Sequence, residues 1–205
     1  MEFSSTVCWL VDAAAACTGA DRFLAELGAH LLADGVPLAG GALTLDIPHP
    51  LIARRTWLWR ADNGEVIEAL GFAPGVPPPA PGACPANDTG RRWLATLAAG
   101  LVHEDAIGLR HDGPLLGWIG PRPFTPRESN ELHHAARFAA APLAVLAARA
   151  TLTAALDAYL GRRSAARVLA APLRRDIGET IQAPRCCSPT CAVSPRSPRT
   201  IRPQR

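Results

Sequence analysis

The longest regular pattern in the chain is helical and runs from Thr125 to about Tyr159. Three helix signals mark its start: Thr125 suits an N-cap, Pro126 suits the first helical position, and Glu128 completes a capping box. Leu132, Ala139, Leu146, Thr153 and Leu160 are then seven residues apart over about four heptads, a spacing typical of helices that pack lengthwise. The predicted dimerisation seam consists of Leu132, Ala136, Ala139, Leu143, Leu146, Ala150 and Leu160.

Pro142 lies inside this pattern and should kink or split the helix. It has no backbone N–H to donate, and its ring clashes with the preceding turn. The seam is also rich in Ala, so each of its layers buries little surface. We therefore expect a weak, parallel homodimer formed through this helix, which Leu146→Glu would dissociate.

Shorter patterns precede the long helix. Two amphipathic helices are predicted between Ser4 and Ala33, and Gly35 suits the end of the second one. The remaining expected elements are strands at 42–47, 56–60 and 66–70, a helix at 91–101, and a β-hairpin formed by 106–109 and 114–119. Together they predict an α+β fold, with an antiparallel sheet, flanking helices and a long C-terminal helix. This order resembles a GAF-type sensor domain whose last helix leaves as a signalling helix.

The net charge of +3 is unevenly distributed along the chain. Five of the 21 basic residues follow Ala183, whereas all 18 acidic residues precede it. The slightly acidic body has no general attraction for nucleic acid, and the basic tail lacks aromatic side chains on which bases would stack. We expect no specific nucleic-acid partner.

Cysteine usage and hydropathy indicate the compartment. No run reaches the roughly 18 consecutive apolar residues of a membrane span, and the N-terminus lacks the basic region of an export signal. We therefore expect a cytoplasmic protein, in which a disulfide framework is uncommon. Cys186, Cys187 and Cys191 cluster without a fourth zinc ligand nearby, so no metal or other cofactor is expected in this chain.

Two groups of side chains are candidate binding residues. Trp57, Trp59 and Trp118 suit a small-molecule pocket between sheet and loops, although tryptophans in strands more often lie in a core. His103-Glu104-Asp105 and His133-His134 suit a metal or acid–base pair, although a loop and a solvated helix face are the more usual interpretations.

Residues 156–183 read "LDAYLGRRSAARVLAAPLRRDIGETIQA". This stretch resembles the junction that precedes the catalytic domain in bacterial class III adenylate/guanylate cyclases, and "WLVDAA" and "FTPRE" resemble their sensor region. The resemblance covers roughly residues 7–183. It implies a GAF-like sensor domain at 1–130, a signalling and dimerisation helix at 126–160, a linker at 161–183, and a tail at 184–205.

In that family the strand after "GET" carries S-D-L-R-G-F-T, whose Asp binds the catalytic metal ions. This chain reads "PRCCSPTCAVSPRSP" instead, so no catalytic residue is present as written. Codons permitted for Arg185–Pro198, taken from the third base of the first codon, encode S-D-L-R-G-F-T. This predicts a change of reading frame near Pro184 and a disordered, out-of-frame tail.

The resemblance implies a non-catalytic regulatory and dimerisation part of a cyclase. An intact relative would convert ATP to cyclic AMP and pyrophosphate with Mg²⁺ or Mn²⁺. Two alternatives stay open: an adenylate cyclase whose frame is intact in the organism, and a stand-alone sensor for an unknown small-molecule ligand.

Overall fold

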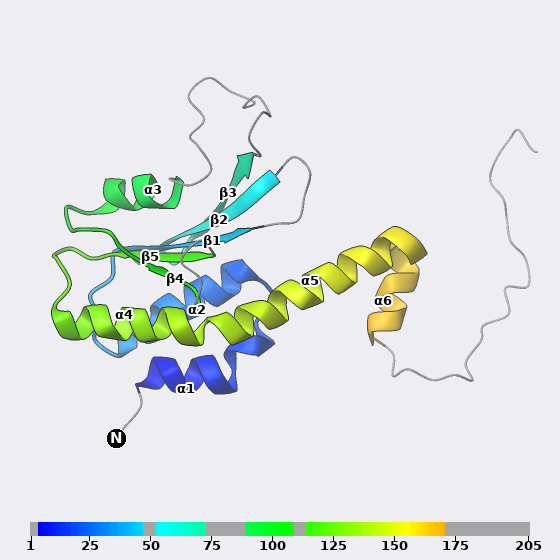
Figure 1. The fold of residues 1–205 in the computed structure, drawn as a ribbon, viewed down its shortest axis with the longest axis horizontal. Helices are drawn as coiled ribbons and strands as arrows, with labels where there is room; N and C mark the ends of the chain where they lie inside the picture. Colours follow the sequence, from blue (N-terminus) through cyan, green and yellow to red (C-terminus); the bar gives the residue numbers. More distant parts are fainter. Residues whose placement is uncertain (1–3, 47–51, 73–88, 109–113, 171–205) are drawn as a thin grey trace, which may run out of the picture.

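An antiparallel sheet of five strands has one helix on one face and the other helices of the body on the opposite face (Figure 1). The computed structural model describes residues 4–46, 52–72, 89–108 and 114–170. The tail at 184–205, with its predicted disorder, lies outside these residues. The strands are β1 (Gly40–Asp46), β2 (Ile52–Arg60), β3 (Val66–Phe72), β4 (His103–Ala106) and β5 (Leu115–Ile119), in the order β3-β2-β1-β5-β4.

Helices cover the two faces of the sheet unequally (Figure 1). The helical elements are α1 (Ser5–Asp12), the short 3₁₀ helix η1 (Ala14–Ala16), α2 (Ala20–Ala33), α3 (Thr89–Leu97), α4 (Pro126–Phe138), α5 (Ala140–Leu160) and α6 (Arg162–Ala170). Strand alternation divides the core in two. Leu43 belongs to the larger cluster with α1, α2 and α4, whereas its neighbour Ala42 packs with Leu94 of α3. The α+β class and the antiparallel sheet are therefore confirmed.

Two glycines allow two tryptophans to approach closely in the larger cluster. A Cβ on Gly28 of α2 would overlap the ring of Trp59, and a Cβ on Gly41 of β1 would overlap the ring of Trp118. The two rings pack edge to face, with centroids 6.2 Å apart and planes at 81°. This contact fixes α2 against the middle of the sheet.

The predicted hairpin is present, but its first strand starts and ends three residues earlier than predicted. Strand β4 is His103–Ala106 rather than 106–109, and Ala106 pairs with Leu115 of β5. His103, Glu104 and Asp105 therefore lie in a strand and not in a loop. The predicted end of α2 is confirmed, since Gly35 has a φ of 91°, which glycine adopts without steric cost.

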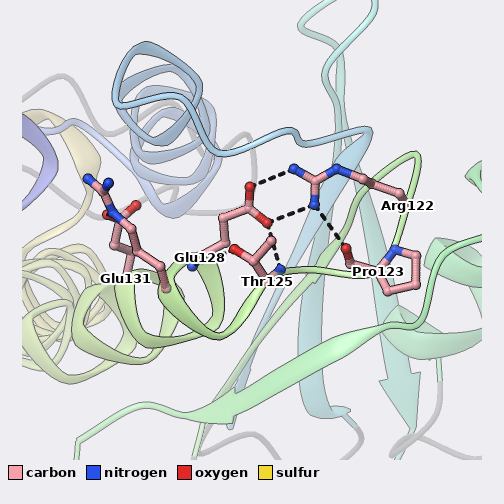
Figure 2. A network of polar contacts seen from close by, with 6 residues as sticks. Arg122, Pro123, Thr125, Glu128 and Glu131 are labelled. Carbon is pink, nitrogen blue, oxygen red and sulfur yellow. Dashed lines mark hydrogen bonds and ion pairs between the residues drawn. The ribbon is translucent and has the colours of Figure 1, made fainter.

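The start of α4 matches the sequence signals (Figure 2). The Thr125 side chain accepts a hydrogen bond from the Glu128 backbone N–H, and the Glu128 carboxylate accepts one from the Thr125 N–H at 2.7 Å. The Arg122 guanidinium donates to both carboxylate oxygens, at 2.7 and 2.9 Å, and to the Pro123 carbonyl at 3.0 Å. This ion pair lowers the pKa of Glu128 to about 2.

Helices α4 and α5 meet at Ala139, three residues before Pro142. The predicted split of the long helix is thus present, and Pro142 lies in the first turn of α5, where a missing N–H costs little. Hydrogen bonds from the Ala139 N–H to Ala135 and from the Leu143 N–H to Ala139 continue the backbone through the junction. Beyond it, α5 projects away from the sheet and ends beside α6 (Figure 1).

Candidate regulatory site

A cleft of about 970 Å³ lies between the sheet and α5. One wall is the η1–α2 turn, a second wall comes from β1, β2 and β3, and the third is the inner face of α5. Its sheet wall consists of Leu45, Arg55, Trp57, Val66 and Glu68, and its α5 wall consists of Leu146, Ala147, Arg149, Ala150, Thr153, Ala154 and Asp157. A molecule bound there would contact the sheet and the projecting helix together.

Charged groups frame an otherwise apolar cleft. Arg55 and Glu68 form an ion pair at 2.9 Å across β2 and β3. The Arg149 guanidinium donates to the Ala15 carbonyl at 2.7 Å, which ties α5 to η1. The carboxylates of Asp21 and Asp157 belong to opposite walls, on α2 and α5. This lining suits an amphipathic small molecule with both apolar and polar groups.

Cys17 lies on the cleft wall but is not a reactive thiol at neutral pH. Burial raises its pKa to about 11, and the nearby Glu26 carboxylate acts in the same direction. The thiol donates a hydrogen bond to that carboxylate at 3.5 Å. Because the thiolate is the nucleophile, this environment opposes covalent chemistry at Cys17.

The three candidate pocket tryptophans lie in two different environments. Trp57 and Trp59 lie two residues apart on one face of β2, but α2 covers Trp59 whereas the cleft lies over Trp57. Trp59 and Trp118 are buried in the larger core cluster. Only Trp57 therefore lines the cleft, while the other two tryptophans are core residues.

The predicted seam is divided between the body and the projecting helix. Leu132, Ala136, Ala139 and Leu143 are buried in the domain's own core. Leu146 is half-buried and Ala150 is exposed, and both line the cleft. Leu160 is exposed at the end of α5. The first half of the seam is thus occupied by the domain itself.

The stretch Pro126–Leu160 meets the length and composition of a membrane span, with a mean hydropathy of 1.6 over its most apolar window and 17% of that window buried. The sequence alone suggested that no segment was apolar enough. Two observations weigh against a span: Leu132 and Ala135 are buried in the core, and Arg149 lies midway along α5 with a hydrogen bond to the body.

A His–Asp–His cluster joins β4 to α4. The two oxygens of the Asp105 carboxylate form separate hydrogen bonds, one with His103 Nε2 at 2.8 Å and one with His133 Nδ1 at 3.0 Å. Sequence reasoning identified each residue as a candidate but could not join them, because Asp105 and His133 lie 28 residues apart. Within the described ranges, no three His, Cys, Asp or Glu side chains come together as metal ligands.

Comparisons with known proteins return no matching family model, no matching curated protein and no matching solved structure. The likeness to cyclases therefore depends on the sequence motifs alone.

Proposed function

We propose that this chain is a cytoplasmic sensor-and-helix module, the non-catalytic regulatory part of a protein resembling bacterial class III adenylate/guanylate cyclases. The observation that carries the proposal is the path of α5. This helix contributes Leu143 to the domain core, forms a wall of the cleft, and then extends past the body. An antiparallel sheet with helices on both faces is also what a GAF-like sensor requires.

The cleft supplies a physical route for regulation. A ligand held between Trp57 and Ala150 contacts the sheet and α5 at once, so it binds best at one separation of the two walls. If α5 has two positions, the ligand shifts their populations by its difference in affinity for them. The C-terminal end of α5 would pass that shift through α6 to the part of the chain after residue 170.

In an intact relative, carboxylate-held Mg²⁺ or Mn²⁺ ions would polarise the phosphates of ATP and activate its 3′-hydroxyl. The described part of this chain brings together no set of metal ligands that fits such ions. We therefore assign none of these steps to its residues. Its own contribution would be to hold and orient two output domains.

The test combines gene sequence and enzymology. We expect sequencing around the Pro184 codon to reveal the frame change, and the restored frame to encode S-D-L-R-G-F-T. The purified chain should form no cyclic AMP or cyclic GMP with Mg²⁺ or Mn²⁺ above a heat-killed control, whereas the restored protein should. Turnover by the chain as written would reject its non-catalytic role, and a restored frame without the motif would reject the cyclase relationship.

The size of the cleft favours one second function, a stand-alone small-molecule sensor. A thermal-shift screen should then find ligands that raise the melting temperature. Trp57→Ala should remove that shift, whereas Trp93→Ala, on α3 against the other face of the sheet, should retain it. If the frame is intact as written and a ligand binds, this second function replaces the first.

A further inference from the structure

Helix α5 and the end of α4 carry two apolar stripes on opposite sides. The inner stripe, with Leu146, Ala150 and Ala154, faces the cleft. The outer stripe consists of Phe138, Val145, Leu152 and Tyr159, which are 43%, 39%, 52% and 89% exposed. Four large apolar side chains therefore face water along one side of a projecting helix.

The outer stripe has the spacing of a coiled coil. Its four residues are seven apart, and Ala141, Ala148 and Ala155 follow three residues after the first three of them. These intervening alanines are also exposed. A straight α-helix drifts by about 20° per heptad, so such a stripe remains in contact only with a partner that supercoils around it. Small residues at alternate layers let two helices approach closely.

We infer that the outer stripe pairs with the same stripe of a second copy of this chain. The inference depends on the proposed function, because it gives the output helix α5 its partner and its contact face. It moves the seam predicted from sequence to the other side of the helix. The inner side of α5 then stays available to the cleft while the outer side holds the dimer.

A second copy fits this stripe better than a bilayer does. The part of α5 beyond Leu143 has 17 residues, Ala144–Leu160, which at 1.5 Å per residue span about 26 Å, less than the roughly 30 Å of a hydrocarbon core. Arg149 lies within this part, and its hydrogen bond to Ala15 holds α5 beside the body. A membrane would have to bury that guanidinium, whereas a helical dimer leaves it at the edge.

The charge pattern favours parallel pairing. Arg149 follows Ala148 and so flanks the seam near its centre. In an antiparallel pair the two Arg149 side chains would lie close together and repel each other. In a parallel pair Arg149 faces Ala144 of the partner subunit, with no like charge opposite. Parallel pairing also sends both C-terminal ends in one direction, as two output domains require.

The surface area that two outer stripes can bury indicates how stable the dimer is. A large side chain has a full accessible area of about 150–250 Å². The exposed parts of the four outer-stripe side chains therefore add up to roughly 400 Å² per chain. A pair would bury about 800 Å², half of a standard interface of ~1,600 Å². The expected assembly is therefore a reversible dimer.

The test is sedimentation of the full chain over a wide concentration range, with two matched Leu→Glu variants. Leu152→Glu places a charge in the outer stripe and should raise the dimer dissociation constant by at least about tenfold. Leu146→Glu places the same charge in the cleft and should leave it within about twofold. Ala154→Glu repeats the inner-face control at an exposed position. Circular dichroism checks that each variant is folded.

Three results would overturn the inference: a monomeric wild-type chain at every concentration, a dimer indifferent to Leu152→Glu, or dissociation by Ala154→Glu. None of these decides the gene sequence or the turnover of the restored protein, so the proposed function stands or fails on its own test. Loss of association with Leu152→Glu alone supports the outer stripe.

Discussion

Helices α4 and α5 follow one another with only Ala139 between them, yet they differ in what covers them. Helix α4 buries Leu132, Ala135 and Ala136 in the core, and a capping box and an ion pair hold its first turn. Beyond Leu143, no side chain of α5 is fully buried, and the helix ends at Gly161, with a φ of 74°.

One continuous helical pattern in the sequence therefore corresponds to a helix with a buried face, α4, and a mostly exposed helix, α5. The sheet and α1 supply partners for the inner face of α4, so its packing is complete within one chain. Beyond Leu143, α5 has its own backbone hydrogen bonds, the contacts at the cleft wall and the contact with α6 near its end. In proteins, most of the stability of a helix comes from the packing of its apolar face against other elements. The part of α5 beyond Leu143 is therefore less fully packed than α4.

Truncating one leucine in each helix should give the largest contrast. Leu132→Ala removes a fully buried side chain and should lower the free energy of unfolding by about 2–5 kcal/mol. Leu152→Ala removes a side chain that is half exposed in the monomer and should change it by less than about 0.5 kcal/mol. Urea titrations at low protein concentration, where any dimer dissociates, provide the measurement. Equal losses would mean that α5 is packed as firmly as α4.

Signals within one helical turn were predictable from the sequence. Which side chains are buried by other elements was not. Thr125, Pro126 and Glu128 act within a single helical turn, so their pattern alone predicts the capping box. Leu132 and Leu146 share one position of the predicted heptad, yet Leu132 is fully buried and Leu146 only half-buried, because the pattern gives the spacing of side chains and not which element packs against them.

The tryptophans and histidines follow the same principle. Alternation predicts that Trp57 and Trp59 share a face, but only the tertiary structure places α2 over one and the cleft over the other. The link between Asp105 and His133 depends on how β4 meets α4. Contacts between distant segments require the fold, which a single sequence pattern does not specify.

A pair of Thr→Ala changes sharpens the contrast at a smaller scale. Thr125→Ala removes the N-cap of α4 and should cost about 1 kcal/mol of stability. Thr151 lies inside α5, where its hydroxyl donates to the Ala147 carbonyl at 2.9 Å. Since Ala favours helix more than Thr does, Thr151→Ala should be neutral or stabilise by a few tenths of a kcal/mol. Thermal melts of both variants measure this, and a loss at Thr151 as large as at Thr125 would contradict the contrast.

The smallest effect concerns acid and is confined to the start of α4. The hydrogen bonds from Arg122 and, to a smaller degree, from the Thr125 backbone N–H lower the pKa of Glu128 from its ordinary value of 4.5 to about 2. The unfolded chain therefore takes up a proton near pH 4.5, while the folded chain resists protonation until about pH 2. The ion pair stabilises the fold fully above pH 4.5, and this contribution disappears as the pH falls through 2. The melting temperature of the wild type should thus exceed that of Glu128→Gln near pH 6, and the two should converge toward pH 2.

The matched control removes the cation instead of the acid. In an Arg122→Gln background the Glu128 carboxylate keeps its bond from the Thr125 N–H but loses both guanidinium contacts. Because Arg122 is the largest cause of the lowered pKa, the pH-dependent effect of Glu128→Gln on the melting temperature should shrink in that background. Added salt should reduce the same effect of Glu128→Gln in the wild-type background, since the Arg122–Glu128 ion pair lies near the surface. An effect that is independent of both Arg122 and salt would assign it to the capping box alone, and the anchoring of α4 would then rest on Thr125 rather than on charge.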